Sequence, residues 1–218
     1  EAGAGSVMTS FNIVDGLPAT ANKWLVTEVL RNQWSFDGFV VTDYASIDEM
    51  EKHGISDRQH NAALALKAGT DMDMVARAFV ETLEKSLNEG LVSQQDIDQA
   101  CRRVLEAKYK LGLFENPYKY CDLERAKNST YLPEYREFAR RMAQESFVLL
   151  KNEGNILPLK KQGTVALIGP MSESKGDIVG TWCVASDPTK YASVKEGLEK
   201  ALEGKGKVLC TQGCNFVD

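Results

Sequence analysis

Residues 38–44, Gly-Phe-Val-Val-Thr-Asp-Tyr, place a short apolar run directly before a carboxylate, Asp43. The run predicts a buried β-strand, because Phe, Val and Thr favour extended backbone. Enzymes built on parallel sheets keep their catalytic groups at the carboxyl ends of the strands. Asp43 is therefore the first candidate for chemistry, and its alternative role is that of a turn or helix-capping residue at a strand end.

Strand and helix patterns alternate on both sides of this run. A strand is predicted over residues 6–12, a helix over 24–34, a second helix over 58–67, a short strand-like segment over 70–74 and a third helix over 76–88. Such alternation favours parallel strands with helices packed outside them, in a closed (β/α)₈ barrel or an open doubly wound sheet. Three strand-helix units cannot close a barrel by themselves.

Two sets of polar residues mark helix starts. Thr20 or Asn22 can cap the helix expected near residue 24. Ser93 followed by Asp96 is a variant of the capping box and predicts the start of an amphipathic helix on the outside of the fold.

The second half of the chain changes character. Residues 114–130 are polar and aromatic, which indicates a linker. Pro133 can start a long helix whose apolar positions continue to Leu150. A strand over 164–168, a helix over 194–202 and a strand over 207–211 then predict one βαβ-like unit.

Composition excludes several classes of partner. The chain has 218 residues, 43% of them hydrophobic, and a net charge of -5 with scattered Lys and Arg residues. Nucleic acid is therefore not an expected partner. No apolar run approaches the roughly 20 residues of a membrane-spanning helix, so no membrane span is expected.

The residues that bind metals give no recognisable pattern. The five cysteines include no CxxC pair, and the two histidines, His53 and His60, lie seven residues apart. We expect neither a metal nor a cofactor. The chain opens on Glu1 and runs at once into a strand-like segment, so the natural start is expected upstream.

Five blocks of sequence, in order, resemble one enzyme family. The block VMTSFNIVDGLPATANKWLVTEVLRNQWSFDGFVVTDYASI (7–47) is similar to the barrel strand, helix and nucleophile strand of glycoside hydrolase family three. The resemblance is to the bacterial periplasmic β-glucosidase type. The other similar blocks are AGTDMDM (68–74), KLGLFENPY (110–118), ESFVLLKNEGNILPL (145–159) and VALIGPMSESKGDIVGTW (165–182).

The resemblance implies roles for four residues. Asp43 matches the catalytic nucleophile of a retaining, exo-acting β-glycosidase. Tyr44 takes the place of an aromatic residue, often Trp, that lines the leaving-group side of the pocket, and Met8 matches a pocket-lining Met. Trp182 follows a Gly-rich stretch and matches a Trp that reaches over the barrel mouth. The alternatives are ordinary packing for Tyr44 and Met8 and a buried core position for Trp182.

The resemblance also implies an architecture. Residues 1–112 would be the last strand-helix units of a (β/α)₈ TIM barrel, 113–160 a linker with a connecting helix, and 161–218 the N-terminal part of an α/β sandwich domain. The substrate would be an oligosaccharide or a β-glucoside, and the intact protein would be periplasmic or secreted. The acid/base Glu and most sugar-binding residues of the family have no counterpart here. The chain alone, as an internal fragment, is therefore expected to be inactive.

Asp71 and Asp73 form the other carboxylate pair. Alternate residues of a strand point to opposite faces, so one is expected to line the barrel and the other to cap a helix, and neither is assigned a catalytic role.

Three other interpretations stay open. The first is the N-acetylglucosaminidase type of the same family, usually a single barrel, which the residues after 155 argue against. The second is a receiver-like signalling domain with Asp43 as phosphoacceptor, for which no acidic pair or Lys is convincingly placed. The third is a non-catalytic remnant or a carbohydrate-binding piece.

Overall fold

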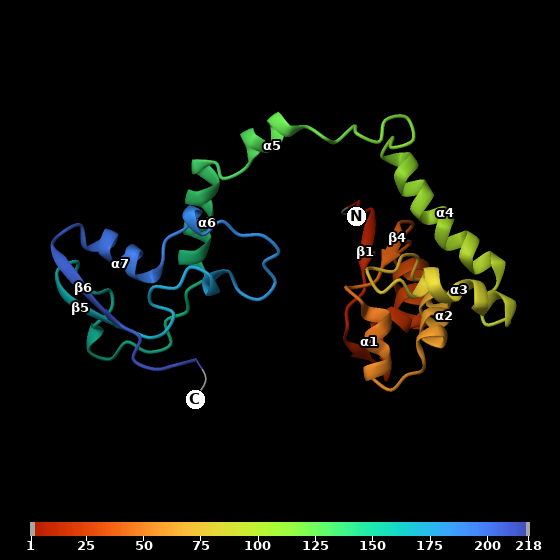
Figure 1. Ribbon diagram of the computed structural model, residues 1–218, viewed down its shortest axis with the longest axis horizontal. Coiled ribbons are helices and arrows are strands. Elements are labelled where there is room, and N and C mark those ends of the chain that lie inside the picture. The colour runs from red at the N-terminus through yellow and green to blue at the C-terminus, as the bar shows by residue number, and fades with distance from the viewer. Residues whose placement is uncertain (1–2, 217–218) are drawn as a thin grey trace. The chain divides into compact units, whose positions relative to one another are not determined.

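The computed structural model describes residues 3–216, which form two compact α/β units with their boundary between Thr130 and Tyr131 (Figure 1). The first unit contains β1 (Ser6–Met8), β2 (Ile13–Val14), β3 (Leu17–Pro18), η1 (Ala19–Ala21), η2 (Trp24–Gln33), β4 (Phe39–Val41), α1 (Ser46–Lys52), α2 (Arg58–Ala68), α3 (Ala78–Asn88), α4 (Gln94–Lys110) and α5 (Leu123–Ser129). The second contains α6 (Pro133–Glu145), η3 (Glu153–Asn155), β5 (Gly163–Ile168), η4 (Asp177–Val179), η5 (Pro188–Lys190), α7 (Val194–Leu202) and β6 (Gly206–Thr211).

A small parallel sheet organises the first unit. β1 pairs with β4 in parallel, with Met8 opposite Val41. A third segment, residues 70–74, joins on the other side of β4 through a parallel bridge between Val41 and Met72. Helix η2 connects β1 to β4, and α1 and α2 connect β4 to the third segment. This arrangement confirms the parallel alternation of strands and helices that the sequence predicts.

The two faces of this sheet differ. Val40 and Thr42 are fully buried, and Val40 lies opposite Val7 on the neighbouring strand, whereas Met8 lies opposite Val41. Met8, on the opposite face, is 54% exposed. Because successive side chains of a strand alternate between faces, the first face is covered by helices and the second is open within this unit.

Small apolar residues let the helices pack closely. Ala62 and Ala65 of α2 pack with Ile47 of α1 in one buried cluster. Leu66 of α2 packs with Ala100 of α4 in another. Helix α2 is therefore the centre of the helical layer, and the complete burial of Ile47 contributes about 1.5–3 kcal/mol to folding.

Local caps explain where the helices begin. Ser93 and Asp96 form a reciprocal capping box at α4, as predicted. Asn22 Oδ1 accepts a hydrogen bond from Leu25 N–H at 3.0 Å at the start of η2. Thr20 is instead fully buried in η1, so only Asn22 caps the helix.

The structure corrects three expected elements. α1 follows Asp43 in a stretch that shows no helical pattern in the sequence. α5 interrupts the expected linker, because the side chain of Asp122 caps it. α6 ends at Glu145, short of the predicted end, in a tightened last turn in which the N–H of Phe147 donates to Gln144 O at 3.4 Å.

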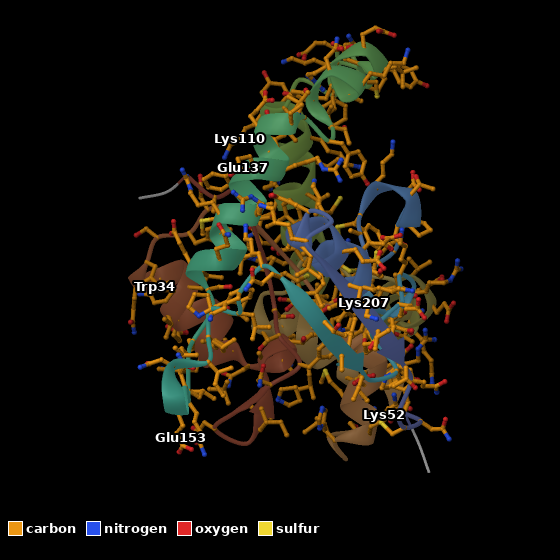
Figure 2. All side chains as sticks on the ribbon, turned by 90° about the vertical axis from the view of Figure 1, so that its left-hand side faces the viewer. Trp34, Lys52, Lys110, Glu137, Glu153 and Lys207 are labelled. Carbon is orange, nitrogen blue, oxygen red and sulfur yellow. The ribbon has the colours of Figure 1, made fainter. Side chains whose placement is uncertain are left out.

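The second unit contains one parallel βαβ arrangement, as predicted. β5 and β6 pair along their full lengths, from Gly163 opposite Gly206 to Ile168 opposite Thr211. Between them, α7 starts with a capping box. Exposed and half-buried residues alternate along β6, and its exposed Lys207 is labelled in Figure 2. In residues 3–216, every helix is too short or too polar to cross a membrane.

Candidate active site

Asp43 lies just beyond the carboxyl end of β4. The strand ends at Val41, and the next residue, Thr42, is fully buried. Since residues alternate, Asp43 belongs with Val41 on the open face of the sheet, the face that also carries Met8. Asp43 is half-buried, so its carboxylate can be reached from outside this unit.

A tight turn fixes the orientation of the Asp43 side chain. The N–H of Tyr44 donates to Asp43 Oδ1 at 2.7 Å, and the N–H of Ser46 donates to the Asp43 carbonyl at 3.2 Å. Asp43 Oδ2 accepts no hydrogen bond from residues 3–216. No side chain caps α1, so Asp43 is not a helix cap. Asp43 Oδ1 is therefore held by a backbone N–H, whereas Oδ2 accepts no hydrogen bond from the described residues.

The neighbouring segments hold this turn from both sides. On one side, Thr9 N–H donates to Val41 O at 3.0 Å. On the other, Thr42 Oγ1 accepts from Met74 N–H at 2.8 Å, and Ala45 N–H donates to Met74 O at 2.9 Å. Ala45 itself has a φ of 53°, in the left-handed region that L-residues avoid. The surrounding contacts therefore impose an uncommon backbone next to Asp43.

The other candidate residues are all exposed within their units. Met8 is 54%, Tyr44 58% and Trp182 87% exposed. The structure brings Met8, Asp43 and Tyr44 together at the carboxyl end of the sheet, whereas Trp182 belongs to the second unit, in the loop that follows η4.

Asp73 is a helix cap, as expected of one member of its pair. Its Oδ2 accepts a hydrogen bond from Phe79 N–H at 3.3 Å at the start of α3. Burial raises the pKa of the Asp73 carboxyl, against the lowering effect of its hydrogen bonds from the backbone. The other oxygen, Oδ1, is buried and has no partner among the described residues.

Asp71 does not line the open face, contrary to one expectation for the pair. Its side chain is 1% exposed. The carboxylate accepts hydrogen bonds from Arg31 Nη2 at 2.5 Å and from Arg103 Nη1 at 2.8 Å. It also accepts from Val40 N–H at 2.8 Å. Burial lowers the pKa of Arg31, and the nearby Asp71 opposes that shift. Asp71 is therefore the centre of a buried ionic cluster with no access to a substrate.

The described residues do not meet the requirements of a metal-binding site. Within residues 3–216, no group of three or more His, Cys, Asp or Glu side chains converges as a metal site would require.

Two sequence patterns of one family match the chain. The pattern of the Glycosyl hydrolase family 3 N terminal domain matches residues 1–107, and that of the Glycosyl hydrolase family 3 C-terminal domain matches residues 147–211. The chain belongs to glycoside hydrolase family 3. The first pattern includes Asp43 and the whole parallel sheet of the first unit, and the second includes Trp182.

Relatives within family 3 are similar over the whole chain. A periplasmic β-glucosidase from Salmonella typhimurium is 37% identical over 100% of this chain and 29% of its own length. A β-xylosidase from Formosa agariphila is 37% identical over 99% of this chain and 32% of its own length. The crystal structure of a β-glucosidase from Listeria innocua in complex with glucose matches 99% of this chain and 29% of its own, at 37% identity and a TM-score of 0.81. The chain thus spans about a third or less of the length of these family 3 proteins.

Proposed function

We propose that this chain is part of a retaining, exo-acting β-glycosidase in which Asp43 is the catalytic nucleophile. The observation that carries the proposal is the placement of Asp43. It follows a parallel strand at its carboxyl end, lies on the open face and keeps one carboxylate oxygen free of hydrogen bonds from the described residues. Membership of family 3 supplies the chemical context for that placement.

The proposed architecture is part of a barrel followed by part of a second domain. We place the last strand-helix units of a (β/α)₈ barrel at 1–112, a linker with its connecting helix at 113–160 and the start of an α/β sandwich at 161–218. The parallel order of β1, β4 and the third segment supports the barrel. The C-terminal domain pattern over residues 147–211 supports the second domain and disfavours a single-barrel enzyme.

The proposed reaction has two steps. Asp43 Oδ2 attacks the anomeric carbon, the glycosidic bond breaks, and a carboxylic acid protonates the leaving oxygen. Water then cleaves the glycosyl ester on Asp43, with the same carboxyl group acting as base, and the anomeric configuration is retained. Retaining enzymes separate their two carboxyl groups by about 5–5.5 Å. We place the second carboxyl group outside residues 1–218, so the chain alone should not hydrolyse glycosides.

Three exposed residues are proposed to contact the sugar. Met8 lies on the same face as Asp43, on the adjacent strand, and can line the pocket from that side. Tyr44 directly follows Asp43 and is proposed to meet the leaving-group side. Trp182 offers a large exposed ring on a loop of the second unit, suited to cover an apolar sugar face. The reaction needs no metal or cofactor.

The relatives suggest the substrate class. Two of them are a β-glucosidase and a β-xylosidase, and a solved relative holds glucose. We therefore propose terminal β-linked sugars of oligosaccharides or β-glucosides as substrates. The Salmonella relative is periplasmic, and we propose a periplasmic or secreted location for the intact protein.

The first test replaces Asp43 in a protein that contains this chain and has the full length of its family 3 relatives, called the family-length protein below. Asp43→Asn removes the nucleophile, and kcat for an aryl β-glucoside should fall by about 10³-fold or more. Asp37→Asn is the matched control, because Asp37 precedes the same strand at its other end and its exposed side chain forms an ion pair with the exposed Lys110. The control should retain nearly full activity, since such pairs contribute little. Full activity of Asp43→Asn would refute the assignment.

A second test identifies the covalent intermediate. A 2-deoxy-2-fluoro β-glycoside with a good leaving group should inactivate the family-length protein and add one sugar. Mass spectrometry of the digest should locate that sugar on Asp43, and Asp43→Asn should stay unlabelled. A label on any other residue would contradict the proposal.

A further inference from the structure

A chain of buried hydroxyl groups lies behind the Asp43 turn. Thr9 Oγ1 is 2.8 Å from Thr20 Oγ1, which is 2.7 Å from Ser46 Oγ. These three residues are 7%, 0% and 3% exposed. Hydrogen bonds between such buried groups matter, because no water replaces a bond that is lost and the unpaired group stays desolvated.

The hydroxyl chain connects two backbone segments of the candidate active site. Thr9 directly follows Met8 at the end of β1, and its N–H donates to Val41 O. Ser46 begins α1, and its N–H donates to the Asp43 carbonyl at 3.2 Å. The hydroxyls therefore link the end of β1 to the backbone of Asp43 without touching the Asp43 carboxylate.

Thr20 is the centre of these contacts. It lies fully buried in η1, far along the sequence from the turn that it supports. Its carbonyl also accepts a hydrogen bond from Thr70 Oγ1 at 2.9 Å, at the start of the third parallel segment. Thr20 thus bonds to residues next to β1, β4 and the third segment, and its burial keeps it from contacting a substrate.

We propose that Thr20 is a positioning residue for the attack by Asp43, acting through Ser46. This inference rests on the proposed function. The carboxylate of Asp43 has only the Tyr44 N–H as a described hydrogen-bond donor, so the position of its free oxygen depends on the backbone that carries it. A displacement of about 1 Å in a reacting group can lower the rate by about 10²-fold.

The experiment compares Thr→Val changes at two sites in the family-length protein. Thr20→Val removes the central hydroxyl and should lower kcat for an aryl β-glucoside by about 10–100-fold, with KM within about threefold of the parent. Thr20→Ser keeps the hydroxyl and should recover most of the rate. Thr27→Val is the matched control. Thr27 belongs to η2, and its Oγ1 donates a hydrogen bond to the carbonyl of Ala68 in α2 at 2.8 Å, away from the Asp43 turn.

A second measurement reports the turn itself, independently of catalysis. Amide hydrogen exchange at Tyr44 and Ser46 should become about tenfold faster in Thr20→Val than in the parent and should stay unchanged in Thr27→Val. Ser46→Ala cuts the same hydroxyl chain at its other end with a smaller change in volume. It should show the same loss of kcat, and it replaces Thr20→Val in the comparison if that variant does not fold.

The outcomes separate the two proposals. Equal effects of Thr20→Val and Thr27→Val on kcat, in a protein that Asp43→Asn inactivates, would overturn the positioning role and leave the nucleophile in place. Unchanged exchange at Tyr44 and Ser46 would overturn it as well. A fully active Asp43→Asn would instead refute the proposed function.

Discussion

Two aspartates at opposite ends of the parallel sheet in the first unit, Asp71 and Asp43, lie in opposite surroundings. At the amino end, Asp71 is 1% exposed and is neutralised by Arg31 and Arg103. Arg31 also donates to the carbonyls of Gly38 and Gly69, the residues just before β4 and the third segment. At this end one carboxylate is shared by two arginines, and Arg31 also joins the backbone segments that precede β4 and the third segment.

At the carboxyl end, Asp43 has no positively charged partner among the described residues. Its carboxylate is held by one backbone N–H, and the support for its position comes from neutral hydroxyls and amides behind the turn. A carboxylate paired with two arginines is a poor nucleophile, because its oxygens are already engaged. The comparison teaches that one end of the sheet holds the strands together, while at the other end one carboxylate oxygen accepts no hydrogen bond from the described residues.

The largest expected difference in stability between the ends comes from Asp71→Ala. The change leaves Arg31, whose side chain is 8% exposed, buried without a counter-charge. The free energy of unfolding should fall by about 3–5 kcal/mol. Asp43→Ala removes no ion pair and should cost less than about 1 kcal/mol. Urea denaturation of both variants in the family-length protein measures the difference, and equal losses would remove the distinction between the two ends.

A smaller effect is expected at Ala45, whose backbone φ is 53°. A β-branched residue is strained in this conformation, whereas Gly adopts it freely. Ala45→Val should therefore be less stable than Ala45→Gly by about 1–2 kcal/mol. Thermal unfolding of the two variants checks this prediction. If both unfold at the same temperature, the turn beside Asp43 is not held in the left-handed region.

The smallest effect concerns Asp73, whose carboxylate accepts a hydrogen bond from Phe79 N–H in the first turn of α3. Burial raises the pKa of its carboxyl from the ordinary value of 3.8. As the pH rises above 3.8, the unfolded chain loses this proton first, so the ionised group lowers the free energy of unfolding at neutral pH. Asp73→Asn keeps an oxygen for Phe79 N–H and removes the charge.

The stability gained by Asp73→Asn over the parent should therefore be larger at pH 7 than at pH 4. Thermal unfolding of both proteins at the two pH values gives the comparison. A gain that is the same at both pH values would show that the charge of Asp73 has no part in it.

Local chemistry made much of the fold predictable. Ser93 and Asp96 are close in sequence and cap the same helix, so the capping box could be recognised directly. The apolar run before Asp43 likewise indicates its own strand. α1 could not be predicted in this way, because it is held by the contacts of Ile47 with α2 rather than by its own periodicity. The end of α6 was missed because the helical spacing of apolar residues continues to Leu150, past the last helical residue Glu145.

The candidate site likewise has residues that local sequence identifies and residues that only tertiary contacts identify. Asp43 could be found from the strand that precedes it, and Asp73 from its position before a helix. The roles of Thr20 and Asp71 could not, because Thr20 reaches a partner 26 residues away, and Asp71 pairs with arginines 40 and 32 residues away. A buried Thr and an exposed Thr look alike in a sequence.

The sequence by itself determined the family, the alternation of strands and helices, and the carboxylate that ends the central strand. Those features depend on residue type and short-range spacing. Only the tertiary structure decided which aspartate is buried with arginines, which one keeps a free oxygen, and which hydroxyls support it. The reason is physical, because burial and hydrogen bonding between distant segments exist only once the parallel strands have paired and the helices have covered one face.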